Sequence, residues 1–138
     1  MAQAAPATPP DDPSVPDDAR LLRRVSKTIG VYRGEGGSRV ASGAFKTRDP
    51  DEGLSVYIEN ELDRRGLTAQ DVLAGLEGQF YVVAIPASLV RSLGNGVIRD
   101  PDPADGLRGE AHAVITGRRR DKVLTALASG SEHVIWDE

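Results

Sequence analysis

Short apolar runs separated by glycine, proline and charged clusters fill the chain from residue 20 onward, and this pattern is typical of a small α/β domain. Phe80–Ile85 is the clearest strand, because every residue in it favours or tolerates a buried sheet and the run is short for a helix. We expect it to lie inside the sheet. The full set of predicted strands is Leu21–Ser26, Leu54–Ile58, Phe80–Ile85, Val97–Arg99, Glu110–Thr116 and His133–Trp136.

Apolar residues at helical spacing predict three helices between these strands, at Glu61–Leu76 with a break near Gly66, at Ala87–Leu93 and at Arg119–Ala128. Thr68 and Asp71 have the spacing of a capping box, so a helix should restart at Thr68. Gly94 can close the second helix in the left-handed conformation.

The remaining segments show weaker patterns. Gly34–Gly37 is expected to form a mobile turn, Arg39–Phe45 an irregular extended segment, and Asp100–Gly109 a loop. At the C-terminus, the strand–helix–strand succession favours a right-handed parallel crossover. The predicted fold class is therefore α+β or mixed α/β: one small domain with a mixed sheet of about five to six strands, three helices and a C-terminal β-α-β unit.

The first residues differ from the rest in composition. Residues 1–19 contain five of the nine prolines and four aspartates but no lysine or arginine. Such a segment has too little apolar surface to offset the entropy of ordering it. We therefore predict a disordered, acidic, proline-rich tail over residues 1–19 and a single domain over residues 20–138.

Charge is divided unevenly between these two parts. The formal net charge is −4, and removing the four tail aspartates from the 21 acids leaves 17, equal to the 17 lysines and arginines. A formally neutral body gives no global reason to expect nucleic-acid binding.

Composition excludes several classes of site. The chain has no cysteine, so disulfides, thiolate metal sites and thiol nucleophiles are excluded. Its two histidines have no recognised metal-ligand spacing, and we predict no metal site. No signal peptide and no apolar run of bilayer length is evident, which predicts a cytoplasmic protein with no membrane contact.

Two groups of polar residues are candidates for chemistry. Glu110 and His112 lie two apart on a predicted strand, so they share a face and form a candidate acid/base pair; the alternative is a packed, hydrogen-bonded structural histidine. Arg118, Arg119, Arg120 and Lys122 precede or begin a helix, where amides and guanidinium groups together could bind an anion. The alternative is a solvated turn neutralised by nearby acids.

A resemblance extends over about 90 residues. It is carried by Leu22-Arg-Arg-Val25, Ser42-Gly-Ala-Phe45, Leu54-Ser-Val56, Gly94-Asn-Gly-Val97 with Asp100-Pro101, and Ala111-His-Ala-Val114 with Gly117. This succession resembles a widespread set of short uncharacterised bacterial proteins. It implies a free-standing bacterial domain and brings no activity with it.

A second resemblance is to the RES-domain toxins, which degrade NAD and have a fold related to ADP-ribosyltransferases. Arg24, Gly37, Arg39 and Tyr57 correspond loosely to an arginine in their first strand, a glycine- and arginine-bearing loop and a strand ending in tyrosine. The family's tryptophan-asparagine signature after the loop arginine is absent here. The resemblance implies NAD as a cofactor or substrate.

Three functions follow from these observations. The leading hypothesis is a small interaction or accessory module that binds a protein partner and needs no cofactor, because no catalytic set is complete. The first alternative is an enzyme acting on NAD or another nucleotide through Arg24, Arg39, Tyr57, Glu110 and His112. The second is an anion or nucleic-acid binder at residues 118–122. Convergence of the five enzyme candidates in one concave pocket would favour catalysis, and scatter would favour the accessory module.

Overall fold

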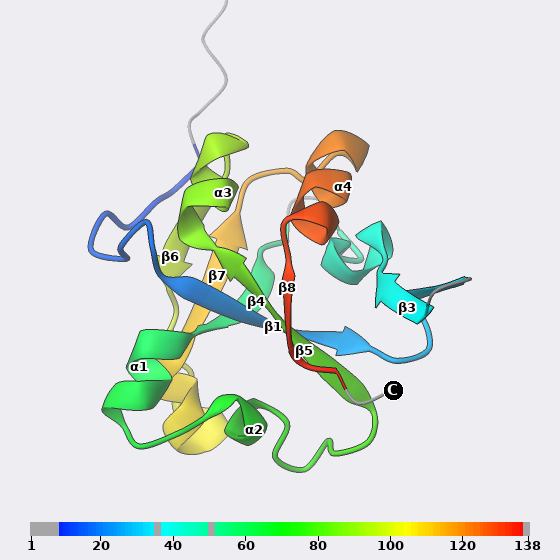
Figure 1. Ribbon diagram of the computed structural model, residues 1–138. Helices are drawn as coiled ribbons and strands as arrows, with labels where there is room; N and C mark the ends of the chain where they lie inside the picture. The colour runs from blue at the N-terminus through cyan, green and yellow to red at the C-terminus, as the bar shows by residue number, and fades with distance from the viewer. Residues whose placement is uncertain (1–8, 35–36, 50–51, 137–138) are drawn as a thin grey trace, which may run out of the picture.

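A six-stranded sheet organises the chain in the computed structural model, which describes residues 9–34, 37–49 and 52–136 (Figure 1). Its strand order is β6-β7-β4-β1-β5-β8, and every hydrogen-bonded pair is antiparallel. The six strands are β1 (Arg20–Ser26), β4 (Leu54–Ile58), β5 (Phe80–Pro86), β6 (Gly96–Arg99), β7 (His112–Thr116) and β8 (Glu132–Ile135). A separate hairpin consists of β2 (Val31–Gly34) and β3 (Gly37–Val40).

Helices cover both faces of the sheet. The α-helices are α1 (Glu59–Arg64), α2 (Ala69–Val72), α3 (Ala87–Ser92) and α4 (Asp121–Ser129), and the 3-10 segments are η1 (Ser42–Phe45) and η2 (Pro103–Ala111). In Figure 1, α3 and α4 lie on one side of the sheet and α1 and α2 on the other. No helix within the described ranges is both long and apolar enough to cross a membrane.

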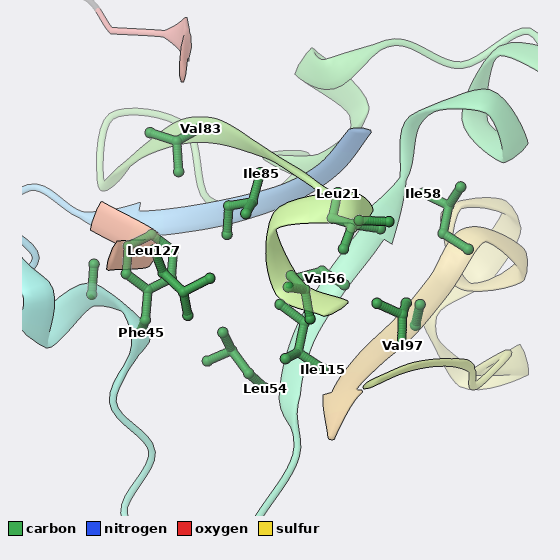
Figure 2. Close-up of a cluster of buried hydrophobic side chains, with 14 of the residues drawn as sticks. Leu21, Phe45, Leu54, Val56, Ile58, Val83, Ile85, Val97, Ile115 and Leu127 are labelled. Atoms are coloured by element: carbon green, nitrogen blue, oxygen red, sulfur yellow. The ribbon is translucent and has the colours of Figure 1, made fainter. Parts of the chain in front are cut away.

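The larger core lies between the sheet and the α3/α4 side. Alternate residues of β1, β4 and β5 point into it because side chains of a strand alternate between faces. Figure 2 shows Leu21, Val56 and Ile85 from these strands gathered near Phe45 of η1 and Leu127 of α4. Arg23 shares this face and its neighbour Arg24 lies on the other, because successive side chains of a strand point to opposite faces.

The smaller core lies on the α1/α2 side. Leu22, Tyr57 and Val82 of the sheet pack there against Leu62 of α1 and Val72 of α2. The predicted restart at Thr68 is confirmed, since Asp71 accepts a hydrogen bond from the Thr68 backbone N–H at 2.7 Å.

The predicted fold class is confirmed, and each of the six predicted strands is present, shifted by no more than two residues at either end. Gly94 has a φ of 84°, as expected for the end of α3. The sheet is antiparallel rather than mixed, however. β7 and β8 run in the same direction, but β4, β1 and β5 lie between them. The strand–helix–strand succession at the C-terminus suggested a crossover between neighbouring parallel strands. The length of the connecting helix does not determine how many strands lie between the two that it joins.

Two segments are more regular than predicted. The extended segment at Arg39–Phe45 is divided between β3 and η1, and the loop at Asp100–Gly109 mostly forms η2, which has a non-helical kink at Gly106. The mobile turn predicted at Gly34–Gly37 includes residues 35 and 36, which lie outside the described residues.

The predicted tail boundary requires a correction. Residues 1–8 lie outside the described residues, but residues 9–19, here called the N-terminal arm, lie against the body. Val15 and Ala19 are fully buried in the larger core. The arm contains only these two buried apolar side chains, so its composition resembles that of a disordered segment although it packs.

The arm also covers the edge strand β6. The Asp12 backbone N–H donates to the Val97 carbonyl at 2.8 Å, and the Val97 N–H donates to the Asp11 carboxylate at 2.9 Å. Arg91 of α3 forms ion pairs with Asp11 and Asp17. Three of the four aspartates on which the prediction of a solvated tail rested, Asp11, Asp12 and Asp17, therefore bind the body.

Candidate functional site

Tyr57 lies at the centre of a polar cluster on the α1/α2 side of the sheet. Its hydroxyl donates to Asp105 of η2 at 2.5 Å, and Asp105 also accepts from Nε of Arg108 at 2.9 Å. Burial, together with the hydrogen bond to Asp105, raises the pKa of Tyr57 to about 12. Arg108 additionally donates to three backbone carbonyls at and after α2. These bonds connect η2 to α2, and they leave the phenol committed to a structural partner.

His112 and Arg24 adjoin the same cluster. The His112 ring contacts Tyr57 edge-on at 5.6 Å, and its Nδ1 lies 2.8 Å from the Asp100 backbone oxygen. The Arg24 guanidinium lies 5.7 Å from the centre of the Tyr57 ring. Three of the five enzyme candidates therefore come together, with one of the two His112 ring nitrogens engaged by the backbone.

The other two enzyme candidates do not join them. Arg39 belongs to the β2–β3 hairpin and lines a groove beside α4, on the opposite side of the sheet. Glu110 lies at the end of η2 rather than on the predicted strand, because β7 begins at His112, and it is exposed. The five residues therefore do not line one pocket.

The predicted anion-binding run divides into two kinds of residue. Arg120 and Lys122 are exposed, and Arg118 is exposed as well. Arg119 turns inward and is only 8% exposed. Its guanidinium donates to the carbonyls of Phe45, Gly117 and Glu52, at 3.1, 3.0 and 2.7 Å. The strand-to-helix turn thus presents one of its arginines to the interior.

A second arginine reaches the same region from the sheet. Arg23 of β1 donates through Nε to the Ala44 carbonyl at 3.3 Å and through Nη1 to the Ser55 carbonyl at 3.0 Å. A cleft of about 350 Å³ is bordered by three cations, Arg23, Lys46 and Arg48, and by one acid, Glu52. An adjoining cavity of about 140 Å³ is bordered by Lys46, Arg48 and Arg119. We call the two together the arginine cleft.

Positive charge in the arginine cleft is not balanced by an ion pair. Within the described residues, none of the four cations Arg23, Lys46, Arg48 and Arg119 forms a salt bridge. Burial, reinforced by the positive charges of Arg24 and Arg119, lowers the pKa of Arg23 to about 10, so the group stays charged at neutral pH. Burial also lowers the pKa of Arg119, and the charge of Glu52 opposes this shift.

Sequence reasoning missed Arg23, Lys46 and Arg48 as site residues. The alternation of the predicted strand Leu21–Ser26, which puts Arg23 and Arg24 on opposite faces, was the one signal that could have found Arg23. No signal in the spacing connected residues 23, 46 and 48 with residue 119, since their proximity depends on how η1 lies against α4.

Among the described residues, no three histidine, aspartate or glutamate side chains lie together as potential metal ligands. Comparison of the chain with protein-family models, with curated proteins and with solved structures found no match.

Proposed function

We propose that this protein is a non-catalytic binding module whose arginine cleft recognises an oxyanion, a phosphate or carboxylate group, carried by its partner. The observation that supports the proposal is the pair of inward-facing guanidinium groups, Arg23 and Arg119, which have carbonyl partners but no carboxylate partner among the described residues. A buried charge that lacks an opposite charge carries a desolvation cost, and a bound anion reduces that cost.

The exposed cations supply the contacts that a ligand can reach. Lys46 and Arg48 border both parts of the cleft, and neither side chain has a hydrogen-bond partner within the described residues. The exposed Glu52 also borders the larger part, so the described side chains that border the cleft carry four positive charges and one negative charge. The local field in the cleft is therefore positive although the body as a whole is formally neutral.

A binding role also accords with the positions of the enzyme candidates. Tyr57 is bonded to Asp105, one His112 nitrogen faces a backbone oxygen, and Arg39 lies on the other side of the sheet. Tyr57 and His112 thus have structural partners that account for their positions without catalysis, and Arg39 is too remote to act with them.

Titration of inorganic phosphate into the full chain at constant ionic strength tests the proposal. Binding should stabilise the fold, by about 1.4 kcal/mol at a phosphate concentration ten times the dissociation constant. The double variant Lys46→Gln/Arg48→Gln removes two exposed charges without disturbing the core, and it should bind phosphate at least tenfold more weakly. Lys122→Gln is the matched control, since it removes an exposed lysine that does not border the cleft.

Two results would overturn the proposal. One is a phosphate response no larger than that of chloride at equal ionic strength. The other is equal weakening by Lys122→Gln, which would place the anion at the exposed run of residues 118–122 instead.

A further inference from the structure

A groove lies between the β2–β3 hairpin and α4, and it is separate from the arginine cleft. Its volume is about 680 Å³, within the range of small-molecule sites. Arg39 and Tyr32 of the hairpin, Ser42 of η1, Thr125 of α4 and His133 of β8 are among its lining residues. No acidic side chain is found among the described residues that line it. We call it the hairpin groove.

A column of stacked aromatic rings ends at one wall of the hairpin groove. The exposed His133 ring lies parallel to the Trp136 ring at 3.8 Å between centres, and Trp136 stacks on Tyr81 at 4.1 Å. The ammonium group of Lys27 lies 4.8 Å from the centre of the Tyr81 ring and so adjoins the other end of the column. His133 is thus the member of this column that borders open space, where a further planar ring could be added.

The opposite wall supplies a cation that stacks on an aromatic ring. Tyr32 and Arg39 are directly paired across β2 and β3, and the Arg39 guanidinium lies 4.6 Å from the centre of the Tyr32 ring. Tyr32 remains 55% exposed, which is unusual for so large an aromatic side chain and leaves part of its surface available. Stacking of this kind restricts the guanidinium before any ligand binds.

The two walls are joined, so the groove is formed in advance of binding. Nε1 of Trp136 donates to Oγ of Ser38 in β3 at 3.2 Å, which connects the ring column to the hairpin. The Ala41 N–H donates to the Gly30 carbonyl at 3.0 Å and closes the base of the hairpin. A site that is already ordered loses less entropy when a ligand binds.

From this geometry we propose that the hairpin groove binds a planar aromatic compound that carries an oxyanion. Its ring extends the column at His133, and its phosphate or carboxylate pairs with Arg39. The hydroxyl groups of Ser42 and Thr125 provide further donors for the anionic group. The inference does not rest on the arginine cleft, which has different residues and no exposed ring.

Trp136 provides a direct reporter, because it is the only tryptophan of the chain and contacts His133. Its emission, excited near 295 nm, should change on titration with either of two ring anions, adenosine monophosphate or benzoate, in the full chain. Adenosine and benzamide carry the same rings without the charge. We expect each of them to bind about tenfold more weakly than the charged compound. The two pairs distinguish a nucleotide from a simple aromatic acid as the preferred source of the ring.

Substitutions separate the two walls. Arg39→Gln should weaken both charged ligands about tenfold and leave the uncharged ones unchanged, whereas His133→Ala should weaken all four. Arg33→Gln is the matched control, since it removes another exposed arginine of the same hairpin that does not line the groove. The midpoint of each titration gives the affinity even where a substitution changes the starting emission.

The proposal is overturned if Trp136 emission in the folded chain responds to none of the four compounds up to about 10 mM. It is also overturned if His133→Ala or Arg39→Gln binds the ring anions as tightly as the unaltered chain. The Lys46→Gln/Arg48→Gln variant should retain this response, so failure of the arginine cleft and failure of the hairpin groove give different results.

Discussion

Replacing Val15 by alanine should destabilise the domain by about 2 kcal/mol. Val15 belongs to the N-terminal arm, yet its side chain is 0% exposed and packs in the larger core. The substitution shortens the side chain by two carbon atoms, and burying each of them contributes about 0.8 kcal/mol to the free energy of unfolding. The cavity that remains adds to the loss. If the arm were the disordered tail that its composition predicts, the same substitution would cost nothing.

Urea unfolding followed by far-ultraviolet circular dichroism measures this difference. Asp18→Ala is the control, because Asp18 is an exposed residue of the same arm, and its replacement should change the free energy of unfolding by less than about 0.5 kcal/mol. A loss below about 0.5 kcal/mol for Val15→Ala as well would refute the packing of the arm. If the slope of the free energy of unfolding against urea concentration is unchanged, Val15→Ala exposes as much surface on unfolding as the unaltered chain.

Three further predictions concern other parts of the fold. Because burial and the bond to Asp105 raise the pKa of Tyr57 from 10.0 to about 12, absorbance titration should show a tyrosine ionising near pH 12 that is missing in Tyr57→Phe. The stability due to the protonated phenol is complete below the unfolded pKa and is lost as pH rises through the folded one. Burial alone would raise the pKa of Asp105, but hydrogen bonds from Tyr57 and Arg108 lower it overall, so its stabilisation is lost as pH falls through the folded pKa. The unfolding midpoint of Asp105→Asn should therefore fall less between pH 5 and pH 2 than that of the unaltered chain. Gly96→Ala would place a methyl group against the Pro10 carbonyl oxygen and should cost more than about 1 kcal/mol in urea unfolding, whereas Gly43→Ala, whose nearest neighbour would be 3.9 Å away, should not.

Local patterns predicted the strands well, and the reason is physical. Phe80–Pro86 is a continuous apolar run, and five of its residues are buried between β1 and β8, so the pattern of the run records its environment directly. The Thr68–Asp71 capping box was equally readable, because all of its interactions are between residues three apart. Elements that depend on residues close together in the chain could therefore be predicted from the sequence.

Strand order and the arm depended on partners distant in sequence. Nothing in residues 9–19 indicates that Asp11 binds the backbone of Val97, 86 residues away. Likewise, local spacing could not show that β4, β1 and β5 separate β7 from β8. Both features depend on which strands and segments pack against one another. The surfaces involved are made of residues from several elements, and these residues come together only on folding.

The candidate site was predicted only in part for the same reason. The run Arg118–Arg120 was recognised as a cationic turn, but which of its arginines faces inward depends on the carbonyl acceptors of Phe45 and Glu52, which are distant in sequence. The sequence showed how many positive charges the turn carries. It could not describe their desolvation, which determines how strongly each of them attracts an anion.

The hydrogen bonds between the arm and β6 bear on how readily this edge of the sheet could pair with another chain. An uncovered edge strand offers free N–H and carbonyl groups to any other extended chain, and it is a common origin of aggregation. Here Asp11 and Asp12 occupy the N–H and the carbonyl of Val97, and Arg91 holds the arm in place. A fragment trimmed to residues 20–138, the boundary that composition suggests, would lose this cover. In sedimentation at equal concentration, such a fragment should self-associate more than the full chain, whereas a fragment that begins before residue 11 should behave like the full chain.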